Sequence, residues 1–369
     1  MKERAGQPGS GTLLRWYDRN AVSVVFFTGY PGFLGSELLP RILRRRADAV
    51  AHCLVQPKFA ALARERAAQF GERVRIIEGD ITTRIGAAAD DVVEIWHLAA
   101  VYDLSVPEAV GVAVNVDGTK HMLDFAERCP ALERFHYVST CYVSGRYEGR
   151  FREDDLEVNQ TFNNFYESTK YLAEVEVRKR RGLPVTIYRP SVVVGDSATG
   201  ATQKFDGPYF VMQWILRQPQ NFSLLPVVGR PADYRFNVVP RDFIVEAIDY
   251  LSAHPAALGR CYQLADPAPL TVDETIEAIA AATGHRVVRV PLPASVAKSA
   301  IEHVPGVYRM MRIPSAAVNY FVHPTDYDTT NATRDLDGSG ISVPRFADYA
   351  RNLVEFVRAH PEVGARGMA

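Results

Sequence analysis

A tyrosine and a lysine four positions apart, Tyr166 and Lys170, are the residues of this sequence best suited to do chemistry. On a helix, positions i and i+4 share one face, so the phenol and the ammonium would point the same way. The ammonium would lower the pKa of the phenol from its ordinary value of about 10, which would make Tyr166 a usable acid. Thr140 follows a predicted strand ending at Ser139, and its hydroxyl would polarise the same substrate oxygen. These side chains predict proton delivery to a carbonyl oxygen.

A glycine-rich loop precedes these residues and reads Thr28-Gly29-Tyr30-Pro31-Gly32-Phe33-Leu34-Gly35. It follows a predicted apolar strand and precedes a predicted helix. In that context Gly29 permits a tight turn, Gly32 lets backbone N–H groups approach a pyrophosphate, and Gly35 allows the helix to pack closely on the strand. The loop therefore predicts a dinucleotide site, to which Phe33 and Leu34 also belong.

The second predicted strand ends at Gln56, where a fold that binds NAD usually places an acid on the ribose. Gln56 is neither acid nor base. Lys58, Arg64 and the arginines at 44–46 lie nearby in the sequence, so a ribose phosphate would be tolerated or favoured. We therefore expect NADPH in preference to NADH. Asp80, after the third strand, either caps a turn or reaches an adenine amine, and the sequence leaves both open.

Short β-branched runs alternate with longer amphipathic segments over the first half of the chain. This pattern is typical of βαβ units and predicts an α/β fold with a doubly wound parallel sheet, the Rossmann type. We expect a flexible tail at residues 1–20 and an NAD(P)-binding Rossmann domain with the catalytic residues at 21–190. Residues 191–369 would form mainly a smaller substrate lobe, with some segments returning to the Rossmann domain. Strands are expected at 23–28, 49–55, 74–78, 92–97, 135–139 and 185–188, and helices at 34–46, 59–70, 108–128, 162–181, 242–252 and 272–283.

The charges of the chain nearly balance, with 42 Lys and Arg against 43 Asp and Glu. No overall field therefore favours nucleic acid or an anionic membrane, and small ligands are the expected partners. The sequence contains neither a long uncharged apolar run nor a signal-like start, which predicts a cytoplasmic protein without stable membrane insertion. The cysteines form no CxxC pair and lie in segments that look buried, so we expect neither a metal site nor disulfides at Cys53, Cys129, Cys141 and Cys261.

Motifs in a fixed order resemble the extended short-chain dehydrogenase/reductase superfamily over about residues 22–265. They are the glycine loop, Trp96-His97-Leu98-Ala99-Ala100, Asn115-Val116-x-Gly118-Thr119, Val138-Ser139-Thr140, Tyr166-x-x-x-Lys170 and Tyr188-Arg189-Pro190-Ser191. The resemblance implies Thr140, Tyr166 and Lys170 as catalytic residues. It implies a cofactor site formed by Gly29, Gly32, Phe33, Leu34, Gly35, Gln56, Lys58, Asp80, Ile81, Ala99, Asn115, Tyr166, Lys170, Pro190 and Val193.

Finer similarity points to the branch that contains thioester reductases and fatty acyl-CoA reductases. It is carried by Gly32-Phe33-Leu34-Gly35, His136-Tyr137-Val138-Ser139-Thr140, Asn164-Phe165-Tyr166-Glu167 and Phe236-Asn237-Val238-Val239-Pro240-Arg241-Asp242. This branch implies hydride transfer to an acyl thioester, CoA- or carrier-bound, or to a related aldehyde or ketone. We expect the acyl donor to arrive on a separate molecule. Those reductases commonly carry Arg where this chain has Gln56, so the usual arginine contact with the NADPH phosphate is not expected at this position.

Two other functions stay open from the sequence. One is an NAD-dependent sugar-nucleotide epimerase or dehydratase of the same superfamily, against which the missing acid at Gln56 argues mildly. The other is a non-enzymatic nucleotide-sensing scaffold, which would have no need of the complete catalytic set. The helices expected at 108–128 and 162–181 would allow a homodimer of the kind this superfamily often forms.

The role of several apolar and aromatic residues also stays open. Tyr209, Phe210, Trp214 and Ile215, with a second group at 307–321, would either line an acyl-chain pocket or form the core of the substrate lobe. In the Rossmann part, His97 would either line the cofactor cleft or pack at its strand end. Arg189 and Arg235 would either meet a substrate phosphate or form salt bridges.

Overall fold

The computed structural model describes residues 22–102, 106–292 and 321–364. The flexible tail expected at residues 1–20 lies outside these ranges, and so does most of the apolar group at 307–321. Within the described ranges, no helix combines the length and the apolar character that a membrane crossing requires.

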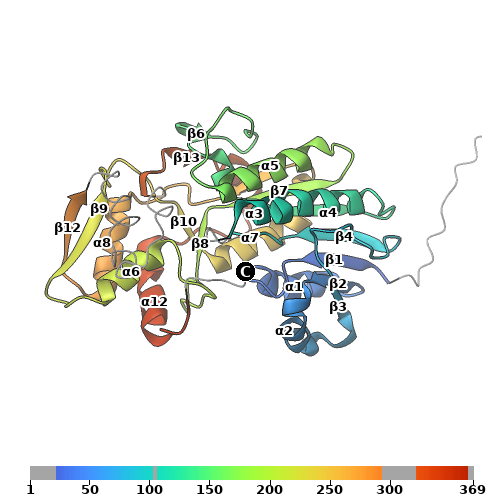
Figure 1. The fold of residues 1–369 in the computed structure, drawn as a ribbon, viewed down its shortest axis with the longest axis horizontal. Helices are drawn as coiled ribbons and strands as arrows, with labels where there is room; N and C mark the ends of the chain where they lie inside the picture. Colours follow the sequence, from blue (N-terminus) through green and yellow to red (C-terminus); the bar gives the residue numbers. More distant parts are fainter. Residues whose placement is uncertain (1–21, 103–105, 293–320, 365–369) are drawn as a thin grey trace, which may run out of the picture.

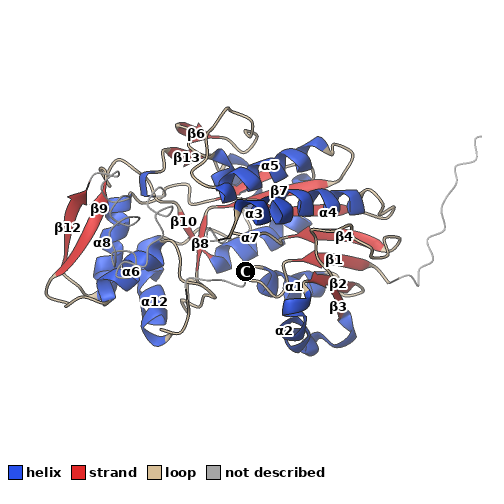
Figure 2. Ribbon diagram, viewed as in Figure 1, coloured by secondary structure: helices blue, strands red, loops and turns tan. Residues whose placement is uncertain are grey.

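Parallel strands form a seven-stranded sheet in the right-hand part of the view (Figures 1 and 2). They are β1 (Val24–Thr28), β2 (Val50–Val55), β3 (Val74–Glu78), β4 (Val92–His97), β5 (Arg134–Val138), β7 (Val185–Pro190) and β11 (Cys261–Leu264). Their order is β11-β7-β5-β4-β1-β2-β3, so the chain moves outward from β1 to β3 and then returns to β4 on the other side of β1. The predicted doubly wound Rossmann fold is therefore confirmed, and such sheets bind ligands at their carboxyl edge near this reversal.

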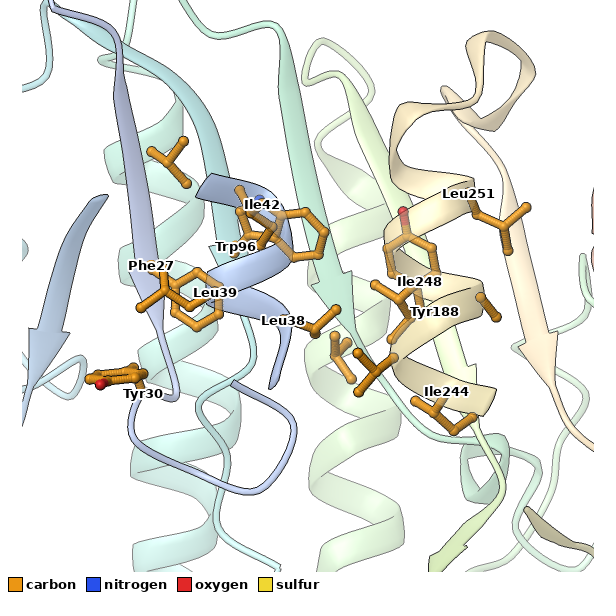
Figure 3. Close-up of a cluster of buried hydrophobic side chains, with 14 of the residues drawn as sticks. Phe27, Tyr30, Leu38, Leu39, Ile42, Trp96, Tyr188, Ile244, Ile248 and Leu251 are labelled. Carbon is orange, nitrogen blue, oxygen red and sulfur yellow. The ribbon is translucent and has the colours of Figure 1, made fainter. Parts of the chain in front are cut away.

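Both faces of the sheet are covered by helices, because successive strand residues point to opposite faces. Phe27 packs with one group of helices, in which Leu38 and Ile248 point toward the sheet (Figure 3). Its neighbour Phe26 packs with the other group. The first group consists of α1 (Gly35–Arg45), α2 (Pro57–Ala67) and α7 (Arg241–Ala253), and the second of α4 (Gly118–Ala126) and α5 (Phe165–Lys179).

The helix expected at 108–128 is interrupted, which corrects the prediction for this segment. A short α3 (Glu108–Gly111) leads into a π-helical stretch, Val112–Asp117, before α4 begins. The periodicity of apolar residues carries no signal for such a turn. Its stabilising contacts are tertiary, since Asn115 within it is buried and bonds to the loop after β4. The other predicted helices begin and end within three residues of the observed ones.

A second apolar core lies beside the sheet, toward the left of Figure 1. Two small parallel pairs, β8 with β10 and β9 with β12, belong to this part of the chain. Its elements are β8 (Val192–Val194), α6 (Pro208–Leu216), β9 (Ser223–Val228), β10 (Val238–Pro240), α8 (Val272–Thr283), β12 (Val287–Leu292) and α12 (Phe346–Ala359).

Residues beyond 190 contribute to the Rossmann sheet as well as to this second core. β11 is the edge strand of the sheet, and α7 and α11 (Thr330–Leu336) pack in the core beneath it. A separate small pair joins β6 (Gly149–Phe151) to β13 (Thr325–Tyr327). Short 3-10 helices occupy Ala68–Arg73, which is kinked at Gly71, and Cys141–Ser144 and Pro255–Ala257.

Candidate active site

The carboxyl ends of five strands bring predicted site residues to one edge of the sheet. Gly29 directly follows β1, Gln56 directly follows β2, and Asp80 lies two residues beyond β3. Ala99 and Thr140 lie two residues beyond β4 and β5. Because parallel strands end on the same side, a ligand lying along this edge would meet all of them.

The glycine loop has no room for side chains at its glycine positions. Gly29 has a φ of +89°, and a Cβ there would lie 2.8 Å from the Cβ of Leu98. A Cβ on Gly32 would lie 2.7 Å from the carbonyl oxygen of Gly29, and one on Gly35 would lie 2.5 Å from the same oxygen. That oxygen accepts a hydrogen bond from the Gly32 N–H at 2.9 Å. The three glycines therefore allow a tight turn that ends at the N-terminus of α1, the geometry that suits a pyrophosphate.

Thr140 and Tyr166 meet at the carboxyl edge of the sheet, where the Thr140 hydroxyl lies beside the phenol and lowers its pKa against the larger effect of burial. Thr140 is buried and is fixed by further contacts, since its Oγ1 accepts from the Tyr142 N–H at 3.2 Å and lies 3.4 Å from the Pro190 carbonyl oxygen. Tyr166 lies in the first turn of α5, whose N-cap is Asn164; the Asn164 side chain accepts the Glu167 N–H. The two hydroxyls are thus placed to act on one substrate oxygen.

The pKa of Tyr166 differs from the expectation. Burial of the phenol raises its pKa to about 12, and the Thr140 hydroxyl beside it offsets only part of that rise. Lys170 does not bring it toward neutrality, because its Nζ is directed elsewhere. The Nζ donates to the Val138 carbonyl oxygen at 2.8 Å and to the Tyr137 hydroxyl at 3.1 Å. At neutral pH the phenol therefore carries its proton, as an acid must.

Lys170 is buried next to these groups, one helical turn beyond Tyr166. Burial lowers the pKa of its ammonium to about 7, although the Glu174 carboxylate opposes this shift. Glu174 is itself fully buried and pairs with Arg189 at 2.6 Å. Burial alone would raise the pKa of Glu174, but the charges of Arg189 and Arg178 hold it at about 2. Of the two roles left open for Arg189, the structure supports the salt bridge, because its guanidinium pairs with Glu174 inside the protein.

The side-chain amide of Asn115 joins two segments of the chain. Its Oδ1 accepts the Val101 N–H at 2.8 Å, and its Nδ2 donates to the Val101 carbonyl at 2.9 Å. The same Nδ2 also donates to Thr169 at 2.9 Å, directly beside Lys170. One amide therefore ties the loop after β4 to the helix that carries the Tyr–Lys pair.

The two interpretations of Asp80 can be compared directly at the end of β3. Asp80 Oδ1 accepts the Thr82 N–H at 2.9 Å, which is the capping role. Oδ2 accepts from Gln56 Nε2 at 2.8 Å, so this side chain is also engaged across the strand ends. Burial would raise the pKa of Asp80, but these hydrogen bonds lower it overall, aided by the charge of Lys58. Lys58 itself lies over the ring of Phe59, at 4.9 Å from its centroid.

The arginines expected to favour a ribose phosphate divide into two groups. Arg45 and Arg46 lie at the C-terminal end of α1, where both pair with the buried Glu94 near the start of β4. They are therefore at the edge of the sheet opposite the glycine loop, and the expectation for 44–46 is wrong. Arg64 does lie at the carboxyl edge, where it pairs with Glu78, the last residue of β3.

The remaining predicted cofactor residues line or support the same edge. Phe33 lies under the guanidinium of Arg241, at 5.2 Å, and Leu34 is the N-cap residue of α1. Ala99 donates its N–H to the Thr28 hydroxyl at 3.3 Å. The side chains of Ile81 and Val193 pack into the hydrophobic cores below the edge, and Pro190 ends β7.

For His97 and for the apolar group at 209–215, the structure supports the packing role and not the role in a ligand site. His97 is buried, with Nδ1 at 2.9 Å from the Thr28 hydroxyl and Nε2 at 3.0 Å from the Thr119 hydroxyl. Tyr209 and Ile215 are fully buried in the second core.

All four cysteines are buried, as expected, and free. Among the described residues, no group of three or more His, Cys, Asp or Glu side chains is arranged to hold a metal.

Sequence reasoning missed the groups that hold the catalytic helix in place. Glu174 and Ser139 share a hydrogen bond of 2.6 Å, and Glu174 pairs with Arg189. Tyr137, on β5, receives a hydrogen bond from Lys170. The signal was present for Glu174, which lies at i+4 from Lys170 on the same helix face. No spacing rule connects Tyr137 to Lys170.

Comparison with known proteins gives a consistent result. The male sterility protein family, an NAD-binding family, matches residues 27–248. A linear gramicidin synthase component from Brevibacillus parabrevis is 30% identical over 288 residues, which are 71% of this chain and 6% of that protein. A fatty acyl-CoA reductase from Drosophila melanogaster is 26% identical over 277 residues, which are 61% of this chain and 53% of that protein. The chain thus spans less than two thirds of the length of these relatives.

Among solved structures, the terminal R domain from the myxalamid PKS-NRPS biosynthetic pathway superposes with a TM-score of 0.77. It is 26% identical, and the match covers 93% of this chain and 92% of that one. The match thus includes the second core as well as the sheet. With the family match over residues 27–248, it shows that the chain belongs to the male sterility/thioester reductase family of the extended short-chain dehydrogenase/reductase superfamily.

Proposed function

We propose that this protein is an NAD(P)H-dependent reductase that transfers a hydride to the carbonyl carbon of an acyl thioester. Thr140, Tyr166 and Lys170 are its catalytic residues in this proposal. The observation that carries it is that the Thr140 hydroxyl lies beside the Tyr166 phenol at the edge of the sheet where the glycine loop also ends. A protein that only bound a nucleotide would have no use for this pair.

The residues at the carboxyl edge suit a dinucleotide. The loop has no space for a Cβ atom at Gly29, Gly32 or Gly35, and it ends at a helix N-terminus. Both features support a pyrophosphate site at these glycines. Gln56 and Asp80 would face the adenosine, and Lys170 the nicotinamide ribose. We further propose NADPH in preference to NADH, because Lys58 lies two residues after Gln56, Arg64 lies at the same edge of the sheet, and position 56 itself carries no carboxylate.

The chain's own groups account for the chemistry at the substrate oxygen. Bound NADPH would supply the hydride to the carbonyl carbon. Negative charge then grows on the carbonyl oxygen, where the Thr140 hydroxyl would donate a hydrogen bond and Tyr166 would deliver its proton. With a pKa near 12, Tyr166 holds that proton until the oxygen becomes basic. Loss of the thiol from the resulting hemithioacetal gives an aldehyde.

The substrate class is proposed from the relatives. One relative is named a fatty acyl-CoA reductase, another belongs to a gramicidin synthase, and the similar solved structure is an R domain from a PKS-NRPS pathway. An acyl group held as a thioester on CoA or on a carrier protein would suit all three. Residues 21–190 would bind the cofactor, and most of 191–369 would bind the acyl donor. A cytoplasmic location stays a prediction, and so does a homodimer, for which Val110 and Leu172 on α3 and α5 are exposed.

The two alternative functions have less support. The sugar-nucleotide epimerase fits the named relatives less well, since one of them is a fatty acyl-CoA reductase. A nucleotide-sensing scaffold would not need a buried lysine and threonine and a partly buried tyrosine brought together at the strand ends. Neither alternative is favoured by a contact within the described residues.

A substrate panel tests the proposal. Purified protein would be given NADPH or NADH with acyl-CoA thioesters, a carrier-bound thioester, free aldehydes, ketones and UDP-sugars, and absorbance at 340 nm would be followed. We expect oxidation of NADPH with thioesters and an aldehyde product, and its loss in Tyr166→Phe. Turnover of UDP-sugars without net cofactor consumption would instead identify the epimerase.

A further inference from the structure

A chain of buried hydrogen bonds ends at Lys170. Its Nζ donates to the Tyr137 hydroxyl at 3.1 Å and to the Val138 carbonyl oxygen at 2.8 Å. The same Nζ lies 4.5 Å from the centroid of the Tyr137 ring. Tyr137 is only 1% exposed, so water does not compete for its hydroxyl. These contacts come from β5, a different element from the helix that carries Lys170.

The Tyr137 hydroxyl in turn lies beside Thr119, which lowers the pKa of Tyr137 against the larger rise caused by burial. Thr119 Oγ1 lies 2.6 Å from the Asn115 carbonyl oxygen and 3.0 Å from His97 Nε2. The other ring nitrogen of His97 lies 2.9 Å from the hydroxyl of Thr28, the residue before the glycine loop. The chain therefore reaches from the loop that would hold the pyrophosphate to the ammonium of Lys170.

The direction of each hydrogen bond follows from the Asn115 carbonyl. A carbonyl oxygen only accepts, so the single proton of Thr119 goes to Asn115, and Thr119 accepts from both of its other neighbours. His97 Nε2 and the Tyr137 hydroxyl must both donate to it. Burial, with the charge of Lys170, lowers the pKa of His97 to about 3, so its ring is neutral and its Nδ1 accepts from Thr28.

This assignment leaves the Tyr137 hydroxyl with only a lone pair to offer Lys170. We propose that Tyr137 is a positioning residue that acts through Lys170: its committed proton makes it a fixed acceptor that orients the ammonium and favours its charged form. The inference rests on the function proposed for Lys170 and adds a role for a residue outside the catalytic set. It also explains why a buried histidine and threonine lie beneath the cleft.

Other charged groups near Lys170 do not replace Tyr137. Glu174 on α5 favours the ammonium, but it is paired with Arg189 of β7 and with Arg178. Asp117 and Lys120, on the neighbouring helical segments, pair with each other at the surface. Tyr166 and His97 are neutral at pH 7. The Tyr137 oxygen and the Val138 carbonyl are therefore the acceptors in direct contact with the Nζ.

The test measures the titration of Lys170 itself. Protein labelled with 13C at the lysine Cε carbon would be titrated by NMR, with the Lys170 signal assigned from its absence in Lys170→Met. Removal of a hydrogen bond to a charged group predicts that Tyr137→Phe lowers the midpoint by about one pH unit. The midpoint for NADPH affinity against pH should fall by a similar amount. The NMR titration needs neither substrate nor turnover, so its outcome is separate from that of the proposed reductase activity.

Tyr188→Phe is the matched control, because Tyr188 is fully buried on the adjacent strand and its hydroxyl bonds to His136 at 3.1 Å. It should leave the Lys170 midpoint unchanged. Thr119→Val keeps the phenol but removes its acceptor, and it should shift the midpoint in the same direction by a smaller amount. An unchanged midpoint in Tyr137→Phe, or an equal shift in Tyr188→Phe, overturns the proposal.

Discussion

The two ends of the proposed cofactor cleft are built in different ways. At the catalytic end, Thr140 and Lys170 are almost fully buried, and each is held by contacts from other strands. At the adenosine end, Gln56 and Asp80 form a single partly buried hydrogen bond, and the Arg64–Glu78 pair is about half exposed. The catalytic residues are therefore held by a network of buried hydrogen bonds. The residues expected to set cofactor preference make only a few independent contacts near the surface.

This difference predicts how the two ends respond to substitution. Removal of one partner from a buried network leaves other polar groups unsatisfied, which is costly in free energy. Exposed pairs contribute little, since water replaces the lost partner. Substitutions at the catalytic end should change the reaction by orders of magnitude, and those at the adenosine end should change only the choice between cofactors.

The largest effect is expected for Tyr166→Phe. The variant keeps the ring and loses the proton donor, so turnover should fall by about 10²- to 10⁴-fold while NADPH affinity stays nearly constant. Steady-state rates and a fluorescence titration of NADPH would measure the two quantities. Turnover at the wild-type rate would refute the assignment of Tyr166 as the acid.

Lys170→Met should weaken both NADPH binding and turnover, because the ammonium is lost while the side-chain volume is kept. We expect about a tenfold loss of affinity, in line with the loss of one hydrogen bond to a charged group. Lys120→Met, at an exposed position of α4, serves as the control and should bind normally. Normal NADPH affinity in Lys170→Met would exclude a contact with the cofactor.

The same variant should change how stability depends on pH. Lys170 has a pKa of about 7 in the folded protein, below the ordinary value of 10.5. Between these values the unfolded chain binds more protons than the folded one, so this group makes stability rise with pH. Lys170→Met should therefore lack this rise, so its stability relative to the wild type should be lower at pH 10 than at pH 7. Urea unfolding of both proteins at pH 7 and pH 10 checks this. A stability of the variant relative to the wild type that increased with pH would contradict it.

The smallest effect on rate is expected at the adenosine end. Gln56→Arg should raise the preference for NADPH over NADH by about tenfold through a charge-assisted contact with the ribose phosphate. Turnover at saturating NADPH should hardly change. Gln69→Arg adds the same charge beyond the far end of α2 and should leave the preference as it is. An equal shift in both variants would show that overall charge, and not position 56, sets the preference.

What the sequence could predict follows the same division. The strand ends and the glycine loop were predictable, because period-2 apolar runs place the residues after them at one edge of a parallel sheet. The arginines at 44–46 were misplaced because a helix of eleven residues carries its C-terminus about 16 Å from its start, at 1.5 Å per residue. Proximity in sequence to a strand end was therefore misleading.

The electrostatics of the site could not be read from spacing. Tyr166 and Lys170 do share a helix face, but burial raises the pKa of the first and lowers that of the second. Burial depends on what packs against α5, and Lys170 finds its acceptor on Tyr137, 33 residues earlier. The π-helical turn at Asn115 has the same origin, since its stabilising contact with Val101 is tertiary.

Isotope transfer tests the central claim most directly. The protein would be incubated with an acyl-CoA thioester and NADPH that carries deuterium in both hydrogen positions at C4 of the nicotinamide, and the products would be examined by mass spectrometry. The account predicts an aldehyde with one deuterium on the former carbonyl carbon, released together with free thiol. An aldehyde without deuterium, or deuterium on a different carbon, would contradict direct hydride transfer at the site formed by Thr140, Tyr166 and Lys170.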